Sequence, residues 1–318
     1  EYADVERLEM FAADVDVVTY EFENVPADTA MVLAAHKPVL PAYKILETTQ
    51  DRLIEKDFVA GLGIGTADYA DVSSPEMLRA AIKRIGLPAV IKTRRFGYDG
   101  KGQAIVREGD DSDRIWNELG TKSAILEAFV PFERELSILS VRGKDGDTRF
   151  YPLVENEHRA SILRLSVPKS DAWTADLQAR AEAHAARVLA ELKYVGVLAI
   201  ELFLTKSGEL VANEMAPRVH NSGHWTIEGA ETSQFENHVR AILGLPLGST
   251  RMIGHAAMIN CIGKLPPKEE ILRVEGVHLH AYGKDASPNR KVGHVTIRAE
   301  SRDELHAKIA KLRPTVDP

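Results

Sequence analysis

The sequence has little of what three classes of protein need. One cysteine, Cys261, allows no disulfide within the chain and suits a reducing compartment. No apolar run reaches the roughly 18 residues of a membrane span, and the acidic start EYADVERLEM does not resemble a signal peptide. A formal net charge of −7 gives no overall positive field for a nucleic acid. We therefore expect a cytoplasmic protein that acts on small molecules, with no nucleic-acid or membrane partner.

What is present is an alternation of helix and strand patterns, which predicts an α/β (α+β) fold. Residues 15–22 form an apolar run typical of a buried strand, and Pro26 begins a helix after it, as in a βα unit of a parallel sheet. Strand patterns between residues 89 and 159 indicate a mostly antiparallel region. Further helices are expected over 4–14, 50–63, 73–88, 174–194 and 231–246, with a strand-rich tail from 255 to 300.

The stretch ELFLTKSGELVANE suggests a hairpin that carries two acidic residues. If Ser207 and Gly208 form a two-residue loop, Glu201 lies opposite Glu214. Like charges in that position repel each other, and burial makes their ionisation costlier. A divalent cation would compensate, and Mg²⁺, with Mn²⁺ as an alternative, prefers carboxylate oxygens. The alternative is a register shifted by one residue, with one glutamate paired to a nearby arginine.

A second stretch, VIKTRRFGYDGKGQ, ends a strand at Lys92 and continues through Gly97, Gly100 and Gly102. Glycines allow positive φ and let backbone N–H groups approach phosphate oxygens. It is not a Walker A loop, because Gly102 follows Lys101 where Ser or Thr would stand. A flap over a nucleotide triphosphate fits better, and a flexible hairpin with surface lysines is the alternative.

The order of Lys92, FGYDGKGQ, ILEAFVPFERE, IELFL and NEMAPRVHNSGHW resembles the ATP-grasp superfamily, in particular its purine-pathway members that carboxylate aminoimidazole ribonucleotide. TYEFENVP and NRKVGH match near the two ends. The resemblance implies a Rossmann-like domain over 1–46, an ATP-grasp domain over 47–250 with a mobile subdomain at about 76–150, and a small β-rich domain over 251–318. Because the Gly-Gly-Gly-Gln-Leu-Gly turn of such proteins is absent here, we expect the N-terminal domain to be incomplete in this chain.

The resemblance also implies the reaction, which belongs to de novo purine biosynthesis. ATP and bicarbonate would form carboxyphosphate, which carboxylates the amine and releases ADP and phosphate, with Mg²⁺ as cofactor and a homodimer as the assembly. Two alternatives remain open: another ATP-grasp ligase, such as one that activates formate or an amino acid, and a non-catalytic nucleotide-binding module.

Site residues follow from the same resemblance. Arg52 and Lys92 would bind phosphates, Glu135 the ribose, and Glu201 and Glu214 the metal. The other expected ATP contacts are the flap (Gly97, Tyr98, Asp99, Gly100, Lys101, Gly102, Gln103), the adenine hinge (Glu127, Ala128, Phe129, Val130), His158, Asn213 and Glu214. With a two-residue loop, Asn213 points away from Glu214, and a β-bulge or a different register would resolve that conflict.

The remaining expected contacts are those of bicarbonate and the ribonucleotide. Bicarbonate would meet Arg218, a bidentate donor to an oxyanion, and His220, Asn221 and Ser222. We interpret His224 as structural. The aminoimidazole substrate would contact Tyr98 and Asp99, and its 5′-phosphate would contact Lys284, Arg290 and Lys291.

Overall fold

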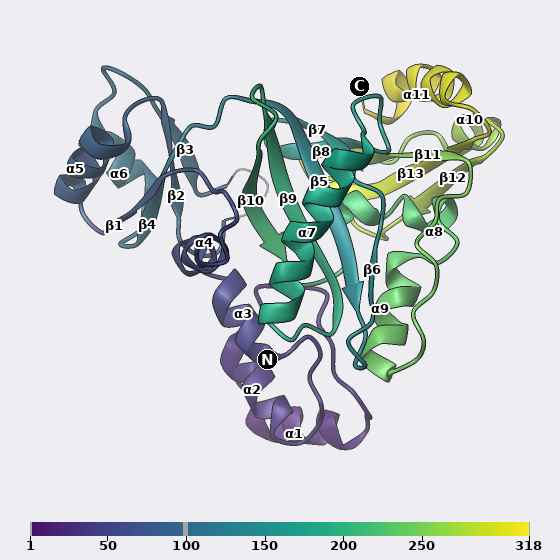
Figure 1. The fold of residues 1–318 in the computed structure, drawn as a ribbon, viewed down its shortest axis with the longest axis horizontal. Coiled ribbons are helices and arrows are strands. Elements are labelled where there is room, and N and C mark those ends of the chain that lie inside the picture. The colour runs from purple at the N-terminus through teal and green to yellow at the C-terminus, as the bar shows by residue number, and fades with distance from the viewer. Residues whose placement is uncertain (1, 98–100, 318) are drawn as a thin grey trace. The chain divides into compact units, whose positions relative to one another are not determined.

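The computed structural model describes residues 2–97 and 101–317 (Figure 1). The chain divides into two compact units, the first made of residues 1–134, 187–194 and 200–218 and the second of residues 135–186, 195–199 and 219–318. The predicted domain boundaries at residues 46 and 250 stay predictions. In the ranges that the structure describes, no helix is long and apolar enough to cross a membrane.

Unit 1 begins with three helices, α1 (Val5–Ala13), α2 (Ala27–Ala34) and α3 (Tyr43–Thr49), of which α3 was not predicted. The strand predicted over 15–22 is wrong, because this segment makes only an isolated parallel bridge between Val18 and Val39. Val18 still lies in the local core with Leu33 and Leu46. A run of apolar residues can therefore be buried without forming a strand, since a strand needs a partner along its whole length.

Unit 1 continues with α4 (Arg52–Gly61) and a four-stranded sheet of order β1-β4-β2-β3. The strands are β1 (Tyr69–Val72), β2 (Ala89–Thr93), β3 (Gln103–Val106) and β4 (Ala124–Ala128), all paired antiparallel. Helix α5 (Pro75–Ile85) begins as predicted, with Ser74 accepting from Met77 N–H and Pro75 in the first turn. With the unpredicted α6 (Ser112–Leu119), it lies beside the sheet (Figure 1), and Leu78 and Trp116 join the core between helices and sheet.

Unit 2 is built on an antiparallel sheet in which β5 (Phe132–Arg142), β7 (Val154–Arg159), β8 (Ile162–Pro168), β11 (His255–Ile262), β13 (Lys291–Ala299) and β12 (Val277–Ala281) follow one another. β6 (Thr148–Phe150) pairs with β5, and β8 was not predicted. The helices are η1 (Asn221–Gly223), α8 (Thr226–Gly229), α9 (Gln234–Leu243), α10 (Lys268–Leu272) and α11 (Arg302–Val316). Leu305 and Ile309 of α11 join Ile259 and Ile297 in the core.

The acidic hairpin consists of two strands that follow a long helix. Helix α7 (Ala175–Glu191) and strand β9 (Gly196–Thr205) each contribute residues to both units, and β10 (Leu210–Ala216), the neighbour of β9, belongs to unit 1. β10 is bonded to the segment that follows α4, where Ala212 N–H donates to Gly65 O at 2.8 Å. This pairing brings the hairpin beside α4 within unit 1.

Candidate active site

Arg52 connects two segments of unit 1 that were predicted to act on ATP phosphates. Its Nη1 donates to Glu214 Oε2 at 2.8 Å, and its Nη2 donates to Gly97 O at 3.2 Å. Burial opposes the charge on the guanidinium, but the Glu214 carboxylate together with Glu55 and Glu127 outweighs it and raises the pKa of Arg52. The predicted phosphate cation, one predicted metal ligand and the start of the predicted flap therefore meet at one side chain.

The base of the predicted flap is closed tightly by Thr93 and Gly102. Thr93 N–H donates to Gly102 O at 2.7 Å, and Gly102 has φ of 70°. A Cβ at Gly102 would lie 2.7 Å from Thr93 Oγ1, so this position requires glycine for both conformation and space. Lys101 and Gln103 are exposed beside it. Three predicted flap residues, Tyr98, Asp99 and Gly100, lie outside the described residues.

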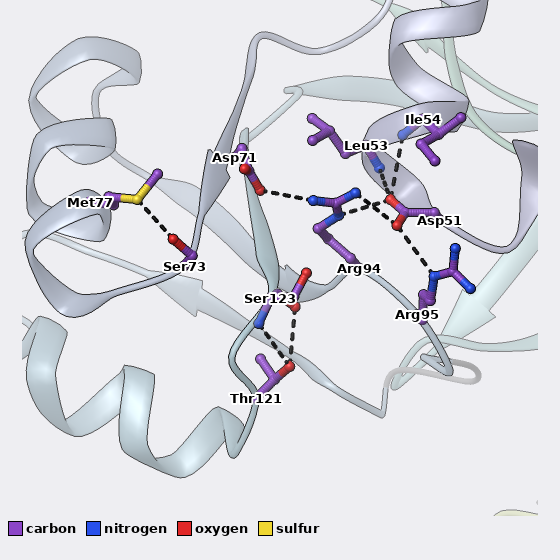
Figure 2. Close-up of polar contacts among 10 residues, drawn as sticks. All are labelled: Asp51, Leu53, Ile54, Asp71, Ser73, Met77, Arg94, Arg95, Thr121 and Ser123. Carbon is purple, nitrogen blue, oxygen red and sulfur yellow. Dashed lines mark hydrogen bonds and ion pairs between the residues drawn. The ribbon is translucent and has the colours of Figure 1, made fainter.

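Asp51 anchors the chain that leads into this flap, a role that the sequence analysis missed (Figure 2). Its carboxylate caps the first turn of α4 and receives Arg94 Nε at 2.9 Å and Arg94 Nη2 at 2.8 Å. Arg95 Nε lies 3.4 Å from the same carboxylate, and Arg94 also reaches Asp71. Burial alone would raise the pKa of Asp51, but the hydrogen bonds from Arg94 lower it below its usual value. The sequence feature that could have indicated this anchor is the pair of arginines, Arg94 and Arg95, directly after β2.

Lys92 pairs with a buried carboxylate. Its Nζ lies 3.0 Å from Glu127 Oε2, and Lys56 Nζ lies 3.5 Å from the same oxygen. Burial acts to raise the pKa of Glu127, yet the two lysines lower it overall. Burial also lowers the pKa of Lys56, which was not predicted as a site residue. Glu127 therefore holds Lys92, the predicted phosphate-binding residue, in place through an ion pair.

The predicted adenine hinge follows Glu127 at the end of β4. Ala128 N–H donates to Asp68 O at 2.7 Å, and Phe129 N–H donates to Pro88 O at 3.2 Å. Val130 O accepts from Phe132 N–H at 2.9 Å. Two of the predicted hinge donors are thus engaged within the protein, so adenine contacts here would have to come from other backbone groups of the segment.

The hairpin loop contains three residues, and the predicted two-residue loop is wrong. Thr205 N–H donates to Glu209 O at 3.0 Å, and Gly208 N–H donates to Thr205 O at 2.9 Å. Gly208 has φ of 82°, whereas Ser207 is not among the described residues with positive φ that a two-residue type I′ loop would need. Next to the loop, Thr205 therefore pairs with Glu209, one residue away from the predicted register. This local shift and the arginine partner of Glu214 both match the alternative interpretation.

The regular alternation of β10 breaks at Asn213. Ala212 directs its backbone groups away from β9, so Asn213 should direct its own toward β9. Instead, Lys56 Nζ donates to both Ala212 O (3.1 Å) and Asn213 O (2.9 Å), and Met215 N–H donates to Glu55 Oε1 at 2.5 Å. This departure indicates a β-bulge, in which two residues oppose one on the partner strand. A bulge was one of the two remedies expected for Asn213.

Arg218, the predicted bicarbonate donor, is paired with a residue of the TYEFENVP stretch. Arg218 Nη2 lies 2.7 Å from Glu23 Oε2 within unit 1. Burial raises the pKa of Glu23, and the arginine counteracts this only in part. Gln50 Nε2 donates to the backbone carbonyls of Glu23 and Val25, both at 2.7 Å, and fixes the segment. The stretch was noted as a motif, but no role had been assigned to Glu23.

Three other predicted bicarbonate residues lie together in unit 2. His220 Nδ1 is 2.8 Å from Ser222 Oγ, and Ser222 is fully buried. Asn221 exchanges two amide hydrogen bonds with the buried Asn260, at 3.1 and 2.6 Å. His224 packs against Phe235 with ring centroids 5.3 Å apart and contacts Gln234 Nε2 through Nδ1, which supports its structural interpretation. Among His220, Asn221 and Ser222, the ring of His220 is held by Ser222.

Unit 2 also contains the predicted ribose and ribonucleotide residues. Glu135 and His158, on neighbouring strands, form a hydrogen bond through Oε2 and Nδ1. Lys284 lies over the Tyr282 ring at 5.3 Å, and the backbone of Arg290 bonds Ser287 and Gly263. Lys284 and Arg290 are exposed, and Lys291 begins β13. The turn between β12 and β13 therefore presents these three cations from an ordered backbone.

The fold and the arrangement around Arg52 define an ATP-grasp protein. The family model described as ATP-grasp domain matches residues 57–235. Residues 1–50 match the ribonucleotide synthetase preATP-grasp domain, and residues 256–308 match the phosphoribosylaminoimidazole carboxylase C-terminal domain.

Within this class, the chain belongs to the N5-carboxyaminoimidazole ribonucleotide synthase family of ATP-dependent ligases. It is 53% identical over 317 residues to the synthase of Pseudomonas aeruginosa, covering 100% of this chain and 87% of the relative. The synthetase structure from Thermus thermophilus is 52% identical with a TM-score of 0.95, covering 100% of this chain and 86% of that one. The Aspergillus clavatus synthase, solved with ADP and 5-aminoimidazole ribonucleotide, is 29% identical with a TM-score of 0.90, covering 100% of this chain and 85% of that one.

Proposed function

We propose that this chain carboxylates the exocyclic amine of aminoimidazole ribonucleotide at the expense of ATP and bicarbonate. The observation that carries the proposal is Arg52, which bonds both the Glu214 carboxylate and the backbone of the glycine-rich segment at Gly97. Phosphoryl transfer depends mainly on positioning and on neutralising charge. A half-buried cation tied to a carboxylate and to the glycine-rich segment supports that chemistry.

We propose that Glu201, Asn213 and Glu214 hold Mg²⁺. Their carboxylate and amide oxygens are the hard donors that this ion prefers, and Mn²⁺ accepts the same set. When bound, the ion would neutralise charge on the β- and γ-phosphates. Arg52 and Lys92 would add their positive charges to the same phosphates.

The reaction has two steps. A bicarbonate oxygen attacks the γ-phosphorus, the bond to the β-phosphate oxygen breaks, and ADP leaves with carboxyphosphate as the product. The substrate amine then bonds to the carboxyl carbon, the bond from that carbon to the phosphate oxygen breaks, and the released phosphate carries away the amine proton. Arg218 and His220 would donate hydrogen bonds to the bicarbonate oxygens, and closure of residues 97–103 would exclude the water that hydrolyses carboxyphosphate.

The ribonucleotide would be held by its 5′-phosphate on Lys284, Arg290 and Lys291. Glu135 and His158 would contact the ATP ribose. We also propose a homodimer, which analytical ultracentrifugation tests, and a cytoplasmic location, where ATP and a purine precursor are available.

ADP release tests the proposed function. We expect it to require both bicarbonate and aminoimidazole ribonucleotide, and isotope from labelled bicarbonate should appear in the carboxylated product. ADP release driven by formate in the absence of bicarbonate would identify a different ATP-grasp ligase. ATP binding without any turnover would contradict the enzymatic proposal.

A further inference from the structure

A chain of buried polar side chains crosses three strands behind His220. Ser166 Oγ donates to Asn156 Oδ1 at 2.8 Å, Asn156 Nδ2 donates to Ser137 Oγ at 2.9 Å, and Ser137 Oγ lies 2.8 Å from Ser222 Oγ. Ser222 Oγ in turn lies 2.8 Å from His220 Nδ1. Ser137, Ser166 and Ser222 are fully buried, and Asn156 is 6% exposed. Buried hydroxyl and amide groups need hydrogen-bond partners, and here they find them in one another.

One arrangement of the protons lets every hydroxyl in this chain both donate and accept, and it points toward His220. In it, Ser137 Oγ accepts from Asn156 and gives its own proton to Ser222 Oγ. Ser222 Oγ accepts the hydrogen bond from Ser137, and its own O–H is directed to His220 Nδ1. His220 Nδ1 is therefore the final acceptor of the chain.

A backbone group favours the same direction. Ser222 N–H donates to His220 Nδ1 at 3.3 Å, a longer and weaker contact than the 2.8 Å one between Nδ1 and Ser222 Oγ. Nδ1 therefore carries a lone pair, and in the neutral ring the proton is on Nε2. Because the hydroxyl contact at 2.8 Å is the stronger of the two, reversing the hydroxyl chain would place the proton on Nδ1.

The backbone of His220 is held by another buried residue, Gln234. Its Oε1 accepts from His220 N–H at 2.9 Å, and its Nε2 donates to His220 O at 2.8 Å. Gln234 N–H donates to Thr226 Oγ1 at 3.0 Å, which fixes Gln234 itself. Gln234 thus clamps the main chain of His220, and the hydroxyl chain contacts its ring at Nδ1.

We propose that Ser137 and Asn156 are positioning residues that keep His220 neutral with its proton on Nε2. His220 then offers a hydrogen-bond donor to the bicarbonate oxyanion and does not serve as a base through Nε2. This inference rests on the proposed function for its chemical meaning. Neither Ser137 nor Asn156 needs to touch a substrate, because both act through Ser222.

The decisive variant is Asn156→Asp, which keeps the shape and replaces the donor Nδ2 with an accepting oxygen. Ser137 would then donate to Asp, Ser222 to Ser137, and His220 Nδ1 to Ser222, so the proton should move from Nε2 to Nδ1. Ser137→Ala interrupts the chain more mildly and should give a mixture of the two tautomers. Ser140→Ala is the matched control, because Ser140 is also fully buried in β5 but donates to Leu198 O outside the chain.

Nitrogen NMR of protein labelled with ¹⁵N-histidine distinguishes a protonated ring nitrogen from a bare one, and a His220→Gln sample assigns the signals. We expect a bare Nδ1 in the wild type and in Ser140→Ala, and a protonated Nδ1 in Asn156→Asp. A protonated Nδ1 in the wild type would overturn the inference. So would an unchanged His220 signal in both folded chain variants, and if Asn156→Asp does not fold, Ser137→Ala decides alone.

Kinetics supply the second readout. We expect Ser137→Ala to lower kcat about tenfold, the effect of weakening one hydrogen bond to a charged group, with the KM for ATP unchanged. Ser137→Thr, which restores the hydroxyl, should recover much of the loss. If the wild type shows no bicarbonate-dependent ADP release, the proposed function fails, but the NMR measurement needs no turnover and still decides whether the chain sets the tautomer.

Discussion

Arg52 and Glu214, 162 positions apart in the sequence, are joined by an ion pair of 2.8 Å. The same guanidinium holds Gly97 O, so one cation contacts a candidate metal ligand and the start of the candidate flap. Glu55 and Glu23 are further carboxylates whose charges interact with Glu214. Arg52 therefore supplies positive charge where the fold concentrates acidic groups.

Replacing Arg52 by methionine should raise the KM for ATP by about tenfold or more, because a phosphate-directed cation and the anchor of Gly97 are both lost. The free energy of unfolding should fall by only about 1 kcal/mol, since the Glu214 side chain is 40% exposed and water screens its charge. Urea unfolding and initial-rate kinetics measure the two effects. Arg114→Met, at a side chain that is 66% exposed, is the control and should change neither.

Glu214→Gln should behave differently from Arg52→Met. It should abolish Mg²⁺-dependent ADP release but cost less stability, because it removes repulsion toward Glu23 together with the ion pair. A loss of several kcal/mol in urea unfolding would instead identify Glu214 as a structural member of the pair.

Asp51 provides a separate test of how the flap is anchored (Figure 2). Asp51→Asn keeps a capping oxygen for α4 but removes the charge that Arg94 and Arg95 surround. We expect a loss of roughly 2 to 4 kcal/mol in urea unfolding, because two cations lose a buried carboxylate. We also expect a lower kcat, since the chain entering residue 97 loses its anchor.

The stability that Asp51 contributes should change with pH in a definite direction. Its folded pKa is lowered, so its contribution to stability is present above the unfolded pKa of 3.8 and is lost as the pH falls through the lower folded value. Below that range the wild type and Asp51→Asn should converge in stability. Asp113→Asn, at an exposed residue that contacts Arg79, is the control. Equal stability of Asp51→Asn and wild type at pH 7 would contradict the role of this anchor.

The sequence predicted elements with strong local signals and missed relationships that depend on distant partners. Ser74 and Pro75 set the start of α5, and the glycine pattern correctly located Gly102 at a tight turn. The hairpin loop was misassigned because a single φ value, at Ser207, separates the two loop types. The residues 15–22 were misassigned because an apolar run does not reveal whether a neighbouring strand exists.

The buried charges of α4 could not be predicted from the helix alone. Lys56 is buried because its Nζ meets backbone carbonyls of Ala212 and Asn213 and the carboxylate of Glu127, all far away in the sequence. Ser137 and Asn156 have no motif signal either, because serines and asparagines in strands are common. The family resemblance located His220, but only the fold supplied the residues that support it.

Arg290→Ala tests the proposed phosphate site in the turn between β12 and β13. Removing this exposed cation should raise the KM for aminoimidazole ribonucleotide by about tenfold, as expected for the loss of a charge-assisted hydrogen bond, and should leave the KM for ATP unchanged. Arg273→Ala, at an exposed arginine that follows α10, is the control. Equal increases in both KM values would contradict the assignment.

Glu55 makes stability depend on pH near neutrality. It is buried on α4, and burial, followed by the Glu214 charge, raises its pKa to about 8. Because the folded pKa lies above the unfolded value of 4.5, the folded state holds a proton that the unfolded state releases, and stability is lost as the pH rises from about 4.5 toward about 8. The loss should be on the order of a few kcal/mol.

Glu55→Gln keeps an oxygen for Met215 N–H but cannot ionise, so it should remove this pH dependence. Urea unfolding between pH 5 and pH 8.5 should show the wild type losing stability relative to the variant, while the exposed Glu108→Gln control follows the wild type. Parallel curves for the wild type and Glu55→Gln would show that Glu55 is ionised in the folded protein throughout. In Glu214→Gln the midpoint of this loss of stability should move to lower pH, because the Glu214 charge raises the pKa of Glu55 and the variant removes that charge. A move to higher pH would contradict this relationship.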